Sequence, residues 1–203
     1  MAKINSFTAP KGRIEVICGP MFSGKTEELI HRLNRLNYCD AHYLLFTPKI
    51  DTRSPKYAAS RNGKKLSSII VSNSNEIIRY IENIKEKIDV IAIDEAQFFD
   101  KNLSVVCNYL ANKKYIVIVS GLDMDFKGKP FSTMKELLII AEEVTKLKAI
   151  CSICGAKASF TERTNINSKK QIVIGDKKIY SARCRHCHSL SKKMDFPKIK
   201  SNF

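Results

Sequence analysis

The segment Gly19 to Thr26 constrains the fold of this chain more than any other feature, because it fits the pattern G-x-x-x-x-G-K-[ST]. A β-branched run, Ile14 to Cys18, precedes it, and an amphipathic segment from Lys25 to about Asn37 follows it. A strand, a glycine-containing turn and a helix in this order are the usual setting of a phosphate-binding loop. The pattern and its context therefore agree.

The residues of this segment suit a nucleoside triphosphate. Glycines allow the backbone to wrap around phosphates, so that N–H groups at the start of the helix point inward. Lys25 would bring positive charge to the β- and γ-phosphates, and the Thr26 hydroxyl would ligate Mg²⁺. We predict that the phosphate site is formed by Gly19, Pro20, Met21, Phe22, Ser23, Gly24, Lys25 and Thr26.

The rest of residues 1–150 alternates between short apolar runs and amphipathic segments. This predicts strands near 14–18, 43–46, 90–93, 115–119 and 144–150, and helices over 25–37, 74–87, 103–110 and 133–142. The polar stretch 49–68 is predicted to be a long loop. Short buried strands between helices indicate a mostly parallel sheet flanked by helices, with ligands beyond the C-terminal strand ends. We expect an α/β, P-loop (RecA-like) ATP-binding domain over 1–150.

Two carboxylates stand at one of those strand ends. Asp94 and Glu95 directly follow the apolar run Val90 to Ile93. Asp94 suits a direct or water-mediated contact with Mg²⁺, whereas Glu95 could accept a proton from an attacking hydroxyl or water. The predicted magnesium ligands are Thr26 and Asp94.

Composition narrows the class of protein. Hydrophobic residues at 44% and charged residues at 27% are typical of a globular chain and not of a disordered one. No apolar stretch approaches the roughly 18 to 20 residues that span a bilayer, and the N-terminus has no apolar region of a secretory signal. We expect a cytoplasmic protein without a membrane partner.

The net charge of +15 raises the question of a nucleic-acid partner. No Arg-rich run with interleaved aromatic residues is present, and a Lys-rich solvated surface explains the charge, so we expect none. Asp94-Glu95-Ala96-Gln97 is similar to the acidic box of helicases, but these couple two sheet domains and this length supplies one. A GTPase would need a guanine-reading Asn-Lys-x-Asp, which Asn112-Lys113-Lys114-Tyr115 does not provide. A small-molecule kinase fits the length better.

Four of the seven cysteines form two pairs near the C-terminus. Cys151-x-x-Cys154 and Cys184-x-x-Cys187 have the spacing of paired zinc-binding thiolates, which predicts a structural Zn²⁺ site. His186 and His188 are the alternative ligands. The 29 residues between the pairs (155–183) must make an excursion. We expect a small zinc-ribbon-like domain over 151–192 and a basic, flexible tail over 193–203.

The motifs occur together in one order. A phosphate loop containing Met-Phe, Asp94 to Phe99 after a strand, Gly121 to Phe126 after the next strand, and a C-terminal four-cysteine module resemble the type II thymidine kinases. The resemblance runs from about Ile14 to Cys187. It implies transfer of the ATP γ-phosphate to the 5′-hydroxyl of thymidine, or of deoxyuridine, giving dTMP and ADP in pyrimidine salvage. It also implies a homotetramer and feedback inhibition by dTTP.

The resemblance assigns a role to each matching position. Glu95 matches the catalytic base. The phosphate side of the site additionally includes Asp51, Arg53, Asp94 and Gln97. The thymine pocket is matched by Met21, Phe98, Leu122, Phe126 and Thr161. A lasso that closes over the nucleoside is matched by Gln171, Ile172, Val173, Ile174, Gly175 and Tyr180.

Two alternatives remain at this point. One is another zinc-containing nucleoside or nucleotide kinase with a different acceptor. The other is a nucleic-acid-stimulated ATPase that would use the basic C-terminal part, in which 12 basic and 3 acidic residues fall within 151–203. Salt-sensitive affinity for DNA or RNA, together with stimulated ATP hydrolysis, would favour the ATPase.

Overall fold

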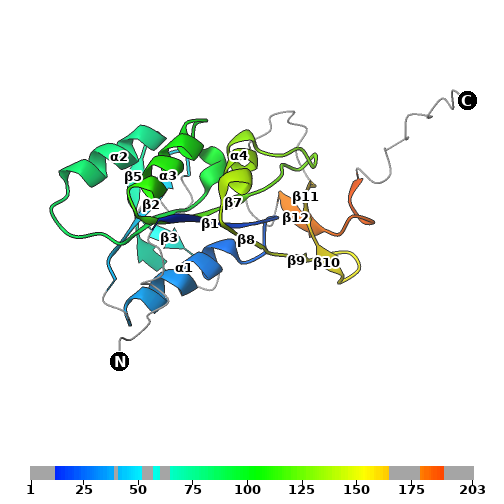
Figure 1. Ribbon diagram of the computed structural model, residues 1–203. Helices are drawn as coiled ribbons and strands as arrows, with labels where there is room; N and C mark the ends of the chain where they lie inside the picture. Colours follow the sequence, from blue (N-terminus) through cyan, green and yellow to red (C-terminus); the bar gives the residue numbers. More distant parts are fainter. Residues whose placement is uncertain (1–11, 39–40, 52–56, 60–64, 165–178, 190–203) are drawn as a thin grey trace, which may run out of the picture.

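A six-stranded parallel sheet forms the centre of the structure (Figure 1). The computed structural model describes residues 12–38, 41–51, 57–59, 65–164 and 179–189. The strand order is β5–β2–β6–β7–β1–β8, and every neighbouring pair is parallel. The strands are β1 (Arg13–Gly19), β2 (Tyr43–Pro48), β5 (Ile69–Val71), β6 (Val90–Ile93), β7 (Ile116–Leu122) and β8 (Glu143–Lys146). The predicted α/β class with a mostly parallel sheet is confirmed.

Helices cover both faces of the sheet, as Figure 1 shows. One face is covered by α1 (Lys25–Leu36), and the other by α2 (Ser74–Asn83), α3 (Leu103–Asn112) and α4 (Ser132–Ile140). Leu29, Leu33 and Leu36 are buried on α1 and join one apolar cluster of the core. Because both faces are covered, the central strands are mostly apolar, and all four residues of β6 are buried. Because β1, β6 and β7 are parallel neighbours, their C-terminal ends lie at the same edge of the sheet.

The structure corrects the predicted elements in three places. Residues 49–68, predicted to be a loop, contain a short antiparallel pair, β3 (Tyr57–Ala59) and β4 (Lys65–Ser67). The sequence did not predict it because strands of three residues are too short to give a periodic signal. The strand predicted over 144–150 is divided between β8, which pairs with β1, and β9 (Ala149–Ile150), which pairs with β10 (Lys157–Ala158). Helices α2 and α4 end earlier than predicted, since the residues that follow them have extended backbone.

A smaller C-terminal structure lies at one end of the sheet. It contains the β9–β10 pair and an antiparallel pair formed by β11 (Phe160–Arg163) and β12 (Tyr180–Arg183), which lie together at the right of Figure 1. We refer to residues 149–163 and 179–189 as the cysteine module. Among the residues that the structure describes, no helix combines the length and apolar character needed to cross a membrane. The predicted tail, 193–203, lies outside the described residues.

Candidate active site and metal centre

The predicted phosphate loop connects the end of β1 to the start of α1, in the strand–loop–helix setting that the sequence indicated. Lys25 Nζ and Ser23 Oγ both donate to the carbonyl oxygen of Pro20, at 2.9 Å each. Phe22 and Gly24 have left-handed backbone, with φ of 69° and 84°. At Gly19, a Cβ atom would lie 2.5 Å from the carbonyl oxygen of Leu147, so the close approach of this segment requires glycine.

Asp94 lies against the phosphate loop at the end of β6. Its Oδ2 accepts a hydrogen bond of 3.0 Å from the Thr26 hydroxyl, and its Oδ1 accepts one of 2.9 Å from the Glu95 amide. Burial, together with the neighbouring charge of Glu95, raises the pKa of Asp94 to about 6, although the hydrogen bonds to this carboxylate act in the opposite direction. The two predicted magnesium ligands are therefore in direct contact.

Glu95 is held by its backbone and by Gln97. Its φ of 54° is a left-handed conformation, which is uncommon for a residue with a side chain. The carboxylate Oε2 accepts a 2.5 Å hydrogen bond from Gln97 Nε2. Gln97 Oε1 in turn accepts from the Leu122 amide at 2.8 Å, which connects the short helix η1 (Ala96–Phe98) to the end of β7. The sequence analysis placed Gln97 on the phosphate side but did not identify this connecting role.

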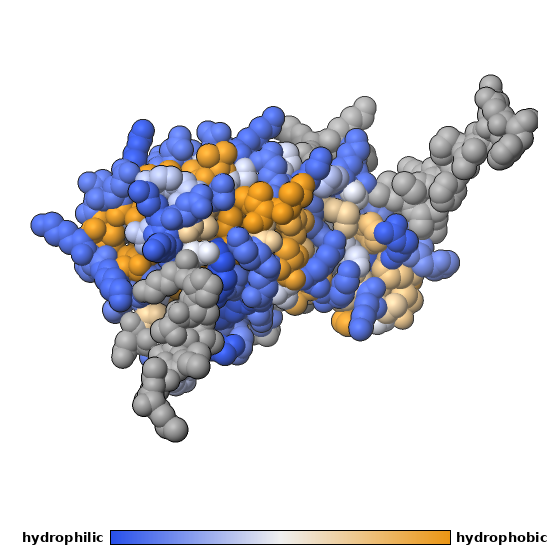
Figure 2. Space-filling view, viewed as in Figure 1, coloured by the Kyte–Doolittle hydropathy of each residue, from blue (hydrophilic) through white to orange (hydrophobic). Residues whose placement is uncertain are grey.

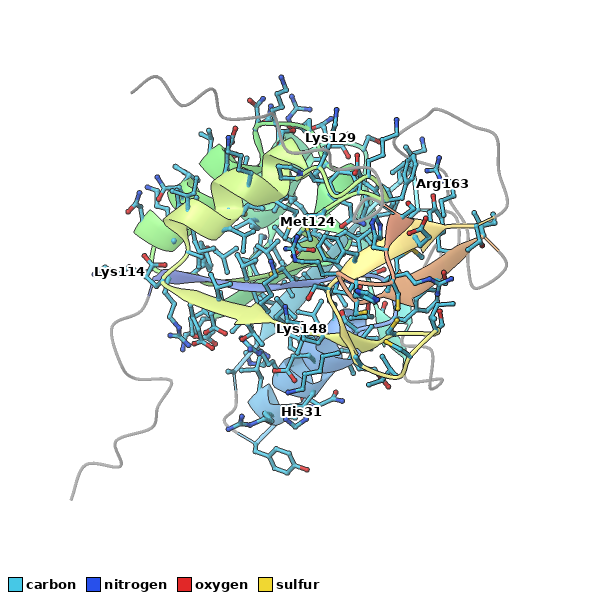
Figure 3. The ribbon with its side chains drawn as sticks, turned by 90° about the vertical axis from the view of Figure 1, so that its right-hand side faces the viewer. His31, Lys114, Met124, Lys129, Lys148 and Arg163 are labelled. Atoms are coloured by element: carbon cyan, nitrogen blue, oxygen red, sulfur yellow. The ribbon has the colours of Figure 1, made fainter. Side chains whose placement is uncertain are left out.

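The residues matched to the thymine pocket come from four separate segments. The Met21 amide donates to Thr161 Oγ1 at 3.0 Å, which joins the phosphate loop to β11. Leu122 and Phe98, at the ends of β7 and η1, are half-buried. Phe126 and Tyr180 both lie close to Arg163, whose guanidinium carbon is 3.7 Å from the centre of the Phe126 ring. Figure 3 labels Arg163 on the hairpin of β11 and β12.

Some predicted positions cannot be compared with the structure. Asp51 follows β2, and its amide donates to the carbonyl oxygen of Pro48 at 3.0 Å. Arg53 lies outside the described residues, as do the lasso positions Gln171, Ile172, Val173, Ile174 and Gly175.

The four paired cysteines converge as predicted. The sulfur atoms of Cys151, Cys154, Cys184 and Cys187 all lie within 4.8 Å of one another, so they can hold a metal ion. The alternative ligands lie elsewhere. His188 is buried, with Nε2 3.2 Å from the carbonyl oxygen of Thr161 and 3.4 Å from Glu162 Oε2, and the His186 side chain is exposed.

An ion pair that the sequence did not predict lies beside the phosphate loop, with its carboxylate buried and its ammonium half-exposed. Asp123, just beyond β7, is 4% exposed and lies 2.8 Å from Lys146 Nζ at the end of β8. Cys18 pairs with Lys146 in the sheet register and lies between these two strands. Burial raises the pKa of the Cys18 thiol to about 11, and the charge of Asp123 adds to this effect. The sequence could have pointed to Asp123, because this carboxylate follows a buried strand, as Asp94 does.

Comparison with known proteins gives a consistent result. The family model described as thymidine kinase matches residues 12–188. A thymidine kinase of Ureaplasma urealyticum serovar 10 is 49% identical over 197 residues, covering 94% of this chain and 88% of that protein. A thymidine kinase of Ureaplasma parvum serovar 3 is 46% identical over 210 residues, covering all of this chain and 92% of that protein. With the phosphate loop, the carboxylates beside it and the cysteine module in place, this chain belongs to the thymidine kinase family.

Proposed function

We propose that this chain transfers the γ-phosphate of ATP to the 5′-hydroxyl of thymidine, giving dTMP and ADP, with deoxyuridine as a related acceptor. The family match supports the reaction. One observation of the geometry carries the proposal: Glu95 is held by Gln97 between the phosphate loop and the end of β7, where Leu122 begins the predicted pocket. Such a reaction belongs to pyrimidine salvage.

Each residue of the site has a distinct task in this proposal. Glu95 accepts the proton of the 5′-hydroxyl as its oxygen attacks the γ-phosphorus. Gln97 keeps the Glu95 carboxylate in one orientation, since it donates to Oε2. Lys25 leaves the Pro20 carbonyl and neutralises charge on the β- and γ-phosphates, while the loop amides bind their oxygens. Asp51 and Arg53 act on the phosphate side, where the resemblance assigns them.

The pair Thr26 and Asp94 suits a magnesium ion. Mg²⁺ prefers hard oxygen ligands in an octahedron about 2.1 Å from the metal, which places neighbouring ligand oxygens about 3 Å apart. The 3.0 Å separation of Thr26 Oγ1 and Asp94 Oδ2 agrees with that geometry. Thr26 and Asp94 would hold the bound Mg²⁺, which would reduce the negative charge of the phosphates.

The four cysteines suit a structural zinc ion. A tetrahedral site with Zn–S bonds of about 2.3 Å has sulfur atoms about 3.8 Å apart. The Sγ atoms of Cys154 and Cys184 are 3.6 Å apart, and all four lie within 4.8 Å. Four thiolates leave no open position, so we assign the zinc a structural role. It would fix β11 and β12, and with them Thr161 and Tyr180.

The nucleoside pocket is proposed between the phosphate loop, the segment after β7 and the cysteine module. Met21, Phe98, Leu122, Phe126, Thr161 and Tyr180 are its proposed lining residues, with the lasso positions Gln171 to Gly175 closing over it. Apolar and aromatic walls suit the flat thymine ring. Exclusion of water by such closure would limit hydrolysis of ATP.

We also propose a homotetramer with feedback inhibition by dTTP. An apolar band runs over α4 and β8 in Figure 2. Ile139 is 74% exposed and Val144 is 44% exposed, and β8 is an edge strand of the sheet. Exposed apolar side chains beside an unpaired strand edge favour contact with another copy of the chain. Light scattering coupled to size exclusion tests the assembly: a monomer at micromolar concentration would contradict it.

The direct test is incubation of the protein with labelled ATP, Mg²⁺ and thymidine, with deoxyuridine, deoxycytidine, deoxyadenosine and a no-nucleoside control in parallel. We expect thymidine-dependent formation of the 5′-monophosphate. Transfer to another nucleoside in place of thymidine would favour a kinase with a different acceptor. Hydrolysis that rises only on addition of DNA or RNA would favour the ATPase.

A further inference from the structure

We propose that Arg163 is a positioning residue that sets the two aromatic walls of the nucleoside pocket, and thereby controls affinity for the nucleoside. The inference rests on the proposed function, because it assumes that Phe126 and Tyr180 line that pocket. It concerns a side chain that neither the predicted site nor the family match assigned.

The strand β11 directs Arg163 toward the same side as Thr161. Alternate residues of a strand share a face, and directly opposed residues of an antiparallel pair share it too. Arg163 opposes Tyr180, and Thr161 opposes Ala182. Thr161 contacts the phosphate loop through the Met21 amide. Arg163 and Tyr180 therefore extend the face of the cysteine module that meets the phosphate loop.

Arg163 contacts both aromatic side chains at once. Its guanidinium carbon lies 3.7 Å from the centre of the Phe126 ring and 5.3 Å from that of Tyr180. Its Nη2 donates to the Tyr180 hydroxyl at 2.9 Å. A planar cation can stack on an aromatic face and donate in its own plane, which a lysine ammonium cannot reproduce. One side chain thus links two rings that are 54 positions apart in the chain.

Phe126 is presented to Arg163 by a turn with its own internal bonds. Asp125 Oδ1 accepts from the amides of Lys127 and Lys129, at 2.8 and 2.9 Å. Lys127 Nζ also lies near the Phe126 ring, at 5.4 Å, but its side chain is exposed. The turn fixes the Phe126 backbone, and the guanidinium then fixes the ring against the cysteine module. Loss of Arg163 should loosen both rings and leave the carboxylates beside the phosphate loop unchanged.

The test compares Arg163→Met and Arg163→Lys with a matched control, Arg185→Met. Arg185 also lies over an aromatic ring of β11, with its guanidinium 4.9 Å from the centre of Phe160, but strand alternation places Phe160 on the other face from Arg163. For Arg163→Met we expect the thymidine KM, and the thymidine Kd measured without ATP, to rise about tenfold. We expect kcat, the ATP KM and the metal content to stay within about twofold. Arg163→Lys should be intermediate and Arg185→Met close to wild type.

The outcomes separate this inference from the proposed function. If wild type does not phosphorylate thymidine, the proposed function fails. If wild type does so and Arg163→Met keeps thymidine KM and Kd within about twofold, the positioning role is wrong. Equal effects of Arg185→Met, or an equal rise in the ATP KM, would also overturn it. Should Arg163→Met fail to fold, Tyr180→Phe removes only the acceptor hydroxyl; an unchanged thymidine Kd in that variant would contradict the role.

Discussion

At the scale of single residues, the proposed chemistry depends on Glu95. Replacing Glu95 by Gln keeps the size of the side chain and removes its ability to accept a proton. We expect kcat for thymidine phosphorylation to fall by about two to four orders of magnitude, with ATP affinity within about threefold of wild type. Glu82→Gln, an exposed change on α2, is the control and should behave as wild type. Near-normal turnover of Glu95→Gln would show that another group accepts the proton.

The raised pKa of Asp94 has a consequence for stability. The folded protein keeps this proton up to about pH 6, because burial and the charge of Glu95 disfavour the carboxylate, whereas the unfolded chain loses it near pH 3.8. The folded state binds more protons between these values, so the contribution of Asp94 to stability falls as pH rises through them. We expect ligand-free Asp94→Asn to have a higher Tm than wild type at pH 7.5, by about 4 to 8 °C, and a clearly smaller difference at pH 4.5.

Asp100 supplies a control of opposite sign for that experiment. Partial burial raises its pKa, but hydrogen bonds from the Ser74 amide and hydroxyl, both 2.7 Å, outweigh burial, and the net shift is downward. The Asp100 carboxylate therefore stabilises the folded protein above the ordinary pKa range of aspartate, and this contribution is lost as pH falls through it. Asp100→Asn should lower Tm at pH 7.5. If each variant differed from wild type by the same Tm at every pH, the shifted pKa values assigned to Asp94 and Asp100 would both be contradicted.

At the scale of helices and strands, the sequence predicted the central sheet because its strands are buried on both faces. The runs at 14–18, 90–93 and 115–119 are mostly apolar, with Glu15 as their one charged residue, and they form β1, β6 and β7. The division of 144–150 between β8 and β9 was not predictable, because it depends on which neighbouring strand each half pairs with. The β3–β4 pair was not predicted from the sequence because each of its strands has only three residues, which is too short for a periodic pattern.

The ion pair of Asp123 and Lys146 joins the ends of β7 and β8, and we expect it to stabilise their arrangement. Lys146→Met would leave the buried Asp123 carboxylate without a countercharge, since among the described residues no other group pairs with it. The Lys146 side chain is half-exposed, so we expect a loss of about 1 to 3 kcal/mol in the free energy of unfolding. The double variant Asp123→Asn, Lys146→Met should recover most of that loss.

The coupling between the two side chains is measured by urea unfolding of wild type, Asp123→Asn, Lys146→Met and the double variant, which together form a double-mutant cycle. Lys148→Met is the matched control, because Lys148 lies two positions further along and makes only an exposed hydrogen bond to Ser159 among the contacts described. Additive effects of the two changes would mean that the ion pair does not couple β7 to β8.

At the scale of the whole molecule, several segments that carry predicted site residues are in contact, as Thr26 is with Asp94 and Met21 with Thr161. The spacing of the cysteines was sufficient to predict their cluster, because two C-x-x-C pairs are typical of a site in which four cysteines bind one metal ion. Contacts such as Gln97 with Leu122, or Arg163 with Phe126, could not be derived in that way. These contacts depend on the direction in which single side chains point between elements that are distant in sequence. Hydrophobic periodicity does not predict those directions.

Metal removal should separate nucleoside binding from ATP binding across the molecule. A metal bound by the four cysteines would join β9–β10 to β12, and β12 pairs with β11, whose Thr161 accepts from the Met21 amide. Without the metal, no ion bridges the four sulfur atoms, and we expect the core of the module to be too small to keep this arrangement. We expect Cys154→Ser, or wild type treated with a strong chelator, to lose metal and thymidine affinity together. ATP affinity should change less, since the phosphate loop belongs to the large sheet.

A variant that is merely less stable must be distinguished from one that has lost its metal. Cys107 is buried on α3, away from the cluster, and Cys107→Ala should lower Tm by leaving a small cavity while keeping the metal and thymidine affinity. We would measure metal content by plasma mass spectrometry and thymidine binding by calorimetry for wild type, Cys154→Ser and Cys107→Ala. These two measurements distinguish loss of stability from loss of the metal. Full thymidine affinity in metal-free protein would mean that the cysteine module holds its pocket-facing strands without an ion. The proposed structural role of zinc would then be wrong.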